Sequence, residues 1–370
     1  MRQNLVPDSR LESVHLEASG ECNMKCVHCY QAKYVKSGEK LNHREIILLL
    51  DQLQNMQVSN VGISGGEPLM MPDLTEVMRA IEARDMRISA LFTNGLLVDD
   101  KLIKETNALR SKFSFFISLD SIPGQTLAFR GVGKRASRVI LERIVSKIRL
   151  LISSGISVVI NTVVNLENIS YLDKMYDLVT ELKVDSWRLG FPKMTPEFKK
   201  HKNGFYVEWN SIAEHCLSLL QRHLIGGLPF HLQIEYLFRE ELFKQGIQEL
   251  SDMDFVCDYE GRRSECCVKP NGDVVSCAYC SELPLGNIRK SSIWDIWYST
   301  QMSDLKKIQI NDVVECRGCE LRSLCGTGCR ANAHFLHGDF HNAKDDYACL
   351  AVAFFKEKVV PLLRKYSMIS

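Results

Sequence analysis

The sequence carries almost no net charge, because its 46 lysines and arginines are balanced by 45 aspartates and glutamates. Proteins that bind nucleic acid through its phosphates carry a basic excess, so this balance argues against a nucleic-acid partner. Long apolar runs are also missing: the nearest candidate, residues 150–164, is interrupted by serines, a glycine and an asparagine and is shorter than the ~20 residues of a membrane span. Residues 1–19 contain charged side chains and no apolar core of a signal peptide. We therefore expect a cytoplasmic protein with no membrane and no nucleic acid among its partners.

Cysteine is abundant but unevenly distributed. The chain of 370 residues, long enough for two or three domains, has 14 cysteines, and none lies between Cys29 and Cys216 or between Cys216 and Cys257. In a reducing compartment clustered thiols are more often metal ligands than disulfide partners. The distribution predicts an N-terminal metal site, a cysteine-free scaffold and a C-terminal metal-rich module. Cys216, which stands alone, is expected to be a buried apolar thiol.

The scaffold repeats one unit of strand and helix. Strands are expected at 14–18, 60–64, 88–92, 113–119, 156–164 and 186–191, with helices from 42 and at 73–84, 99–109, 137–153 and 168–182. Six strands separated by helices predict an α/β fold, a partial (β/α)6 barrel of the TIM type, whose chemistry lies at the C-terminal ends of the strands. We expect this barrel in residues 1–205, a helical bridge in 206–255 and a small cysteine-rich domain in 256–370. The lysine-rich stretch from Lys193 to Lys202 is expected to be a solvated linker.

Three cysteines follow the first expected strand directly, with the spacing Cys22-x3-Cys26-x2-Cys29. Three closely spaced thiolates can hold three irons of a [4Fe-4S] cluster and leave the fourth iron open, whereas an electron-transfer cluster is normally closed by four cysteines. An open iron can bind a substrate. The alternative is a structural zinc site that His28 or His43 completes.

This loop resembles the signature of the radical S-adenosylmethionine (SAM) superfamily. The resemblance implies that SAM chelates the open iron through its amino and carboxylate groups. An electron from the cluster then splits the sulfonium and yields a 5'-deoxyadenosyl radical, which removes hydrogen from an unactivated carbon. Other segments at strand ends match the family and imply these SAM contacts: Gly65, Gly66, Glu67, Ser118, Arg130 and Leu189. In this reading Glu67 accepts the methionine ammonium, Arg130 lies near the carboxylate and Leu189 near the adenine.

The C-terminal cysteines follow a second pattern. Cys316 begins a Cys-x2-Cys-x5-Cys-x3-Cys run, and upstream of it Cys267 to Val275 predicts a hairpin with Asn-Gly at its turn. The pattern resembles the SPASM domain, a C-terminal extension of radical SAM enzymes that holds two auxiliary [4Fe-4S] clusters. The resemblance implies two ligand sets, Cys316, Cys319, Cys325 and Cys349 for one cluster and Cys257, Cys277 and Cys329 for the other. A pair of zinc ribbons is the alternative.

The second of these sets lacks its usual fourth cysteine. The family often places it a few residues from Cys257, and no cysteine lies between Cys216 and Cys257. Cys266, Cys267 or Cys280 could supply it, or one iron could stay open for substrate. Cys266 and Cys267 are adjacent on a strand, so at most one of them faces a given cluster. A thiol left unliganded could instead donate a hydrogen atom, and Cys280 is the catalytic candidate, as hydrogen donor or as ligand.

The resemblance implies an enzyme, a radical SAM oxidoreductase or maturase, with SAM and three [4Fe-4S] clusters as cofactors. Such enzymes often modify ribosomally made peptides or proteins through a crosslink, a thioether or side-chain oxidation. The alternatives are the biosynthesis of a small-molecule cofactor or antibiotic, peptide epimerisation and, from a different class, a non-catalytic iron–sulfur or zinc scaffold. Ala278 stands where sulfatase-maturing members carry an aspartate base, which argues against formylglycine formation.

The expected partners follow from the same resemblance. They are a peptide or small-molecule substrate and an electron donor of the flavodoxin or ferredoxin type. The 21 residues before Cys22 are too few for a leader-binding domain, so a peptide substrate would be recognised by the barrel mouth or by a separate peptide-recognition protein.

Overall fold

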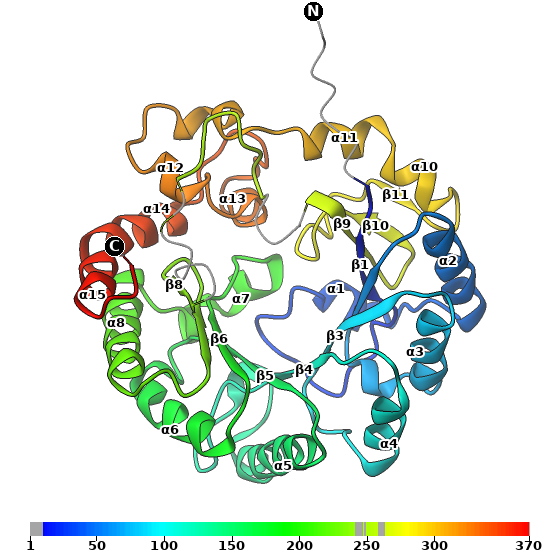
Figure 1. Ribbon diagram of the computed structural model, residues 1–370, viewed down its shortest axis with the longest axis horizontal. Helices are drawn as coiled ribbons and strands as arrows, with labels where there is room; N and C mark the ends of the chain where they lie inside the picture. The colour runs from blue at the N-terminus through cyan, green and yellow to red at the C-terminus, as the bar shows by residue number, and fades with distance from the viewer. Residues whose placement is uncertain (1–9, 241–246, 248, 258–262, 370) are drawn as a thin grey trace, which may run out of the picture.

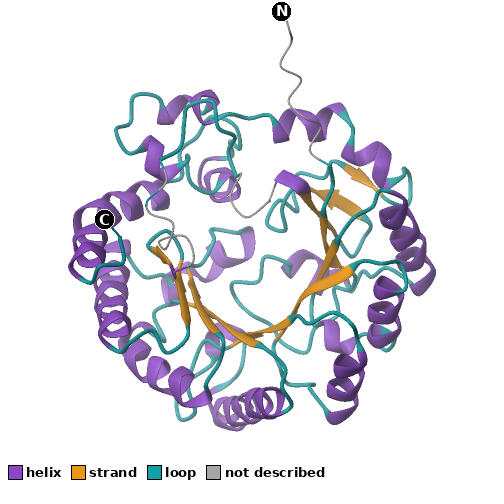
Figure 2. Cartoon of the chain, in the orientation of Figure 1, coloured by secondary structure: helices purple, strands orange, loops and turns teal. Residues whose placement is uncertain are grey.

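The computed structural model describes residues 10–240, 247, 249–257 and 263–369. One eleven-stranded sheet curves into a partial barrel with helices on its outer side (Figures 1 and 2). Its first six strands run parallel in chain order, which confirms the predicted α/β partial barrel. These strands are β1 Ser13–Glu17, β2 Asn60–Ser64, β3 Arg87–Thr93, β4 Ser114–Ser118, β5 Val158–Val163 and β6 Ser186–Gly190.

Capping side chains and a glycine mark the ends of three of the helices between these strands. The Asn42 side chain caps α2 by accepting the Glu45 N–H, and the Glu45 carboxylate accepts the Asn42 N–H, which completes a capping box. Asp99 caps α4, and Gly155, with φ of 75°, follows the end of α5. The barrel helices are α1 Ala32–Ser37, α2 His43–Asn55, α3 Leu74–Glu82, α4 Asp100–Ala108, α5 Lys134–Ser153 and α6 Leu172–Leu182.

Further strands extend the sheet at both ends. After β6, β7 (His231–Ile234) pairs in parallel and β8 (Phe238–Arg239) pairs with β7 in antiparallel. At the other end β9 (Glu265–Val268) lies parallel to β1 and continues as the predicted hairpin into β10 (Asp273–Val275) and β11 (Gly286–Asn287). The C-terminal module therefore joins the barrel through a shared sheet.

Two expectations about the connecting region are wrong. Residues 206–255 are not helical throughout, because β7 and β8 follow α8 (Trp209–Ile225); β7 takes its backbone partners from β6, which the local sequence does not reveal. The stretch from Lys193 to Lys202 is no solvated linker. It contains the start of α7 (Pro196–Phe205), and Lys193 is only 9% exposed and pairs with Glu235, with Nζ 2.6 Å from Oε1.

The C-terminal module is made of short elements. Its helices are α10 Ile293–Trp297, α11 Thr300–Lys306, α12 Arg322–Cys325, α13 Arg330–His337, α14 Asp346–Phe354 and α15 Val360–Lys365, with a π-helical turn at Phe355–Val359. Short 3-10 turns lie at Pro68–Met70, Ala128–Arg130, Ile169–Tyr171, Ile310–Asp312 and Val314–Cys316. Helix α14 packs against α8, so the C-terminal helices lie against the side of the barrel.

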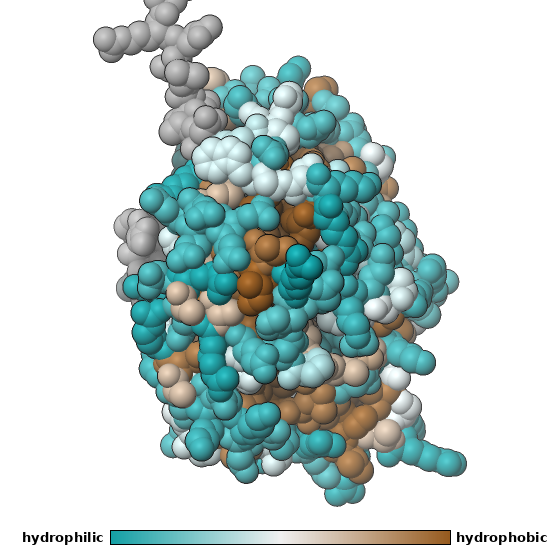
Figure 3. All heavy atoms as spheres, turned by 90° about the vertical axis from the view of Figure 1, so that its right-hand side faces the viewer, coloured by the Kyte–Doolittle hydropathy of each residue, from teal (hydrophilic) through white to brown (hydrophobic). Residues whose placement is uncertain are grey.

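The strands bury one face against the helices and turn the other into the barrel. Trp187 and Leu189 of β6 belong to the main apolar core, and Trp187 contacts Tyr176 of α6. The residue between them, Arg188, therefore faces the lumen. On the outside, the face that carries α2, α3 and α10 is mainly hydrophilic, with apolar residues gathered near its middle (Figure 3). No helix in the described ranges has the length and apolar character needed to cross a membrane.

Candidate active site and metal centres

The three-cysteine loop, defined as residues 20–30, follows β1 and is held between two glycine contacts. Gly66 donates its N–H to Ser19 O at 2.7 Å, and a Cβ on Gly66 would lie 2.3 Å from Glu21 O. On the other side a Cβ on Gly131, at φ of 72°, would lie 2.3 Å from Lys25 O. Only glycine allows both approaches, so these two residues fix the position of Cys22, Cys26 and Cys29.

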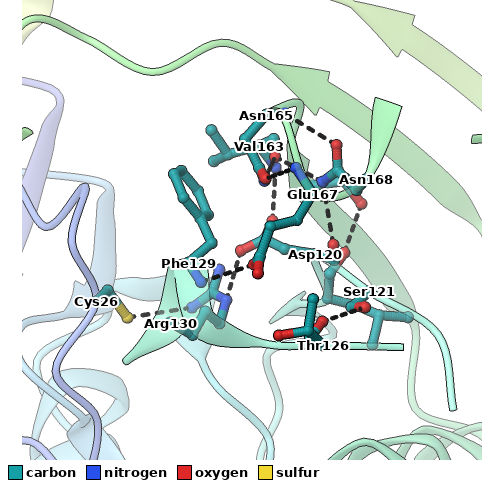
Figure 4. A network of polar contacts seen from close by, with 12 residues as sticks. Cys26, Asp120, Ser121, Thr126, Phe129, Arg130, Val163, Asn165, Glu167 and Asn168 are labelled. Atoms are coloured by element: carbon teal, nitrogen blue, oxygen red, sulfur yellow. Dashed lines mark hydrogen bonds and ion pairs between the residues drawn. The ribbon is translucent and has the colours of Figure 1, made fainter. Parts of the chain in front are cut away.

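Arg130 and Asp120 form a buried ion pair beside this loop (Figure 4). Arg130 Nε lies 2.6 Å from Asp120 Oδ2, and Arg130 Nη1 donates to Cys26 Sγ at 3.8 Å. Asp120 also accepts the Val163 N–H, which ties the pair to β5. Burial raises the pKa of Cys26, and the Arg130 guanidinium opposes that shift. Arg130 therefore places a fixed positive charge next to one thiol of the loop.

Glu67 joins the ends of β2 and β3. Its carboxylate accepts the Thr93 hydroxyl at 2.5 Å and the Asn94 N–H at 2.8 Å, and it is 1% exposed. Burial raises the pKa of Glu67, and these bonds lower it. Gly65 and Gly66, immediately before it, allow its segment to contact the three-cysteine loop.

A polar row crosses the lumen at the level of Ser118. The parallel register places Ser118 opposite Asn161, Asn161 opposite Arg188 and Arg188 opposite Gln233. Sequence reasoning identified Ser118 but missed the other three, although the alternation of buried and lumenal residues in β6 could have revealed Arg188. Leu189, expected at the adenine, lies on the helix-facing side of β6, so its side chain is in the core and not in the lumen.

Aromatic rings bring the first metal loop and the C-terminal module together. Tyr30 follows Cys29, Tyr279 lies between Cys277 and Cys280, and the centroids of the two rings are 4.9 Å apart. The predicted sites at the two ends of the chain are therefore neighbours in space.

The C-terminal cysteines gather in the two predicted sets. Cys325 interacts electrostatically with Cys349, Cys316 and Cys319. Cys329 interacts in the same way with Cys257 and Cys277, and Cys280 with Cys277 and Cys329. Cys216 and Cys266 are wholly buried among apolar side chains, the first as predicted.

The three thiols of the loop fit three irons of a [4Fe-4S] cluster. In the described residues no group of three or more His, Cys, Asp or Glu side chains could hold a single metal ion. His43 Nδ1 lies 2.6 Å from Asp73 Oδ2, so His43 is paired outside the loop. His28 stacks on Phe129 with 3.9 Å between the ring centroids, and its Nδ1 is buried without a hydrogen-bond partner. Burial raises the pKa of Cys22 to about 11 and that of Cys29 to about 12. A bound cluster would lower both pKa values, because its iron ions stabilise the thiolates.

Comparisons with known proteins agree with this arrangement. The radical SAM superfamily model matches residues 16–179, and the iron–sulfur cluster-binding domain model named SPASM matches residues 257–320. An AdoMet-dependent heme synthase from Methanosarcina barkeri is 27% identical over 338 residues, covering 88% of this chain and 92% of its own. An Fe-coproporphyrin III synthase from the same organism is 24% identical, with 89% and 85% covered.

Solved structures share the fold at low sequence identity. The structure of anSMEcpe with bound AdoMet and the Cp18Cys peptide has a TM-score of 0.72 at 17% identity and covers 96% of this chain and 98% of its own. SuiB from Streptococcus suis, bound to S-adenosylmethionine, has a TM-score of 0.70 at 18% identity, with 92% and 77% covered.

Proposed function

Because this chain is a radical SAM enzyme with a C-terminal SPASM domain, we propose that it cleaves SAM reductively on the three-cysteine loop and oxidises a substrate by hydrogen abstraction. Bound together, SAM and its [4Fe-4S] cluster supply a 5'-deoxyadenosyl radical, and two further clusters belong to the SPASM domain. The observation that carries this proposal is the loop itself. Cys22, Cys26 and Cys29 follow the C-terminal end of β1, and the loop offers three thiols for four irons, which would leave one iron free for SAM.

The surrounding residues would hold SAM and the loop. Glu67 offers a buried carboxylate at the end of β2 for the methionine ammonium, while its bonds to Thr93 and Asn94 fix its position. Ser118, in the lumenal row, offers a hydroxyl to the nucleoside. Arg130 donates from Nε to Asp120 and from Nη1 to Cys26, so its guanidinium is held beside the loop. There it would place a positive charge near both the cluster and the SAM carboxylate.

For the substrate we propose a small molecule with carboxylate side chains, of the iron-porphyrin class. The relatives that cover nearly nine tenths of this chain are named for heme and Fe-coproporphyrin III synthesis. Arg188 lies in the lumenal row, where a guanidinium can pair with a carboxylate; its guanidinium carbon lies 5.5 Å from the centre of the Phe116 ring. This choice puts the small-molecule alternative ahead of peptide modification, the reaction favoured by the SPASM resemblance.

A peptide stays the second candidate because of the open side of the sheet. Within the described residues the sheet ends at β8 on one side and at β11 on the other without closing. An extended chain could enter along such an opening. A flavodoxin or ferredoxin in the cytoplasm would supply the electron in either case.

Anaerobic turnover separates these candidates. The reconstituted enzyme, dithionite and SAM are incubated with Fe-coproporphyrin III deuterated in its propionate side chains, or with a deuterated test peptide. With the porphyrin, and not with the peptide, we expect deuterium in 5'-deoxyadenosine and a mass change of the substrate. The C26A variant should give neither result. Transfer from the peptide and not from the porphyrin would reverse the order of the two candidates, and transfer from neither would reject both.

A further inference from the structure

The auxiliary cluster nearest the barrel has only three ligands assigned by the family pattern, and its fourth ligand is missing. Cys257, Cys277 and Cys329 account for three ligands, and the sequence leaves Cys266, Cys267, Cys280 or no residue as the fourth. The structure separates these possibilities by where each thiol lies.

Cys266 and Cys267 are held in the middle of the sheet. They lie on β9 between β1 and β10, where Cys266 is opposite Val14 and Cys267 is opposite His15 and Val275. Cys266 belongs to the main apolar core, on the opposite face from Cys267. Its position excludes it from the set.

Cys267 lies on the same face as the set and interacts electrostatically with one of its members, Cys277, but it is fixed in the sheet. Its charged neighbours are Glu17 and Lys269, which form a buried ion pair, and its cysteine neighbours are Cys266 and Cys277. It is wholly buried in regular sheet, where the backbone cannot turn to bring the thiol toward Cys329.

Cys280 lies on a tight turn that brings it close to Cys277. The Cys280 N–H donates to Cys277 O at 2.8 Å, so the two residues close a tight turn. The same bond joins Cys29 to Cys26 and Cys319 to Cys316, each at 3.3 Å, and both of those pairs belong to predicted cluster sites. All three Cys-x2-Cys segments of the chain therefore share one backbone arrangement.

The electrostatic interactions of the thiols agree with the proximity that the backbone turn indicates. The Cys280 side chain is hydrogen-bonded to Cys277 and interacts electrostatically with Cys329. Cys280 and Cys267 both belong to the apolar cluster that Cys277 and Cys329 border, so burial does not separate them and the backbone turn does. Cys329 in turn interacts electrostatically with Cys257, so electrostatic interactions connect all four residues.

We propose that Cys280 is the fourth ligand of this auxiliary cluster, which Cys257, Cys277, Cys280 and Cys329 close completely. The assignment rests on the proposed function only in that the SPASM domain binds clusters. A cluster closed by four cysteines has no open iron for substrate, and a liganded Cys280 cannot serve as a hydrogen donor.

The test removes the catalytic cluster so that only the auxiliary ones are observed. In the full-length C22A/C26A/C29A background, about eight irons per chain are expected after anaerobic reconstitution. Adding C280A should halve the iron or convert one cluster to a three-iron form with a new electron paramagnetic resonance (EPR) signal. Adding C267A, the matched control, should leave both iron and spectrum unchanged.

A second variant covers the case in which C280A folds poorly. C280S keeps the turn and offers an oxygen ligand, so iron should be retained while the EPR signal of one reduced cluster shifts. Unchanged iron and unchanged spectra in both Cys280 variants, or the same change in C267A, would overturn the assignment. Because these chains cannot cleave SAM, the result is independent of whether the proposed reaction is correct.

Discussion

Lys269 and Glu17 form an ion pair at the junction of barrel and C-terminal module, with Lys269 Nζ 2.6 Å from Glu17 Oε2 and both side chains wholly buried. Glu17 ends β1 and accepts the hydroxyl of Tyr30, the residue after Cys29, at 3.0 Å. Lys269 follows β9 and donates to the carbonyl of Ala278, the residue after Cys277, at 2.5 Å. The pair thus ties the three-cysteine loop to the loop of the neighbouring auxiliary cluster.

Removing one partner of this pair should destabilise the protein strongly. The K269M variant leaves the Glu17 carboxylate buried without its cation, which costs about 3–5 kcal/mol in comparable sites. The free energy of unfolding of the metal-free protein measures this loss. R149A, which breaks an exposed pair with Glu181, is the control and should change it by less than about 1 kcal/mol. Equal effects of the two variants would contradict a structural role for the buried pair.

Arg130 should tune the catalytic cluster through its charge. A cation beside Cys26 favours the reduced cluster, which is more negative, so R130Q should lower the midpoint potential by on the order of tens of millivolts. R130K keeps the charge and should shift the potential less. A redox titration followed by EPR, using the signal that responds to SAM, measures both. A higher potential in R130Q would show that the guanidinium acts otherwise.

Gly66 should be indispensable to the three-cysteine loop. In G66A the new methyl group meets Glu21 O at 2.3 Å, a backbone atom, so the loop must move. We expect the loss of about four irons per chain and of SAM cleavage, with the auxiliary clusters retained. G133A, where a Cβ would meet nothing within 4 Å, is the matched control. Normal iron and cleavage in G66A would mean that the loop is not held as described.

The buried side chain of His223 should make the free energy of unfolding depend on pH, independently of the cluster sites. Burial lowers the pKa of His223 to about 4, from 6.5, with Glu240 opposing the shift. The unfolded chain therefore binds more protons between these values, and stability must fall as the pH falls from 6.5 toward 4, by on the order of 2 kcal/mol between pH 7 and 5. In H223N this part of the slope should vanish, while in H231N, at a half-exposed neighbour, it should stay. Identical pH profiles for wild type and H223N would contradict the burial effect.

Sequence reasoning reached the parts of the fold that local chemistry controls. The helix that begins at Asn42, the Asn-Gly hairpin turn and the six alternating strands are each set by short segments of the sequence. The pairing of β9 with β1 is different, since the Glu17–Lys269 contact joins residues 252 positions apart and neither position is unusual in its own segment. The short β7 was missed for the same reason.

The candidate site, like the fold, could be predicted from the sequence only in part. Spacing indicated Cys22, Cys26 and Cys29, and the resemblance to the SPASM domain implied the two C-terminal sets. The side chain of Leu189 was misplaced because a one-residue step along a strand reverses the face. The choice between Cys267 and Cys280 needed the backbone turn that only the structure provides.

SAM cleavage tests the central claim most directly. The anaerobically reconstituted protein is reduced with dithionite in the presence of SAM, and 5'-deoxyadenosine is counted per chain beside the C26A variant. We expect more than one equivalent of 5'-deoxyadenosine from the wild-type protein, about twelve irons per chain and no cleavage by C26A. A protein with the full iron content that releases no 5'-deoxyadenosine, or bound zinc in place of iron, would contradict the account.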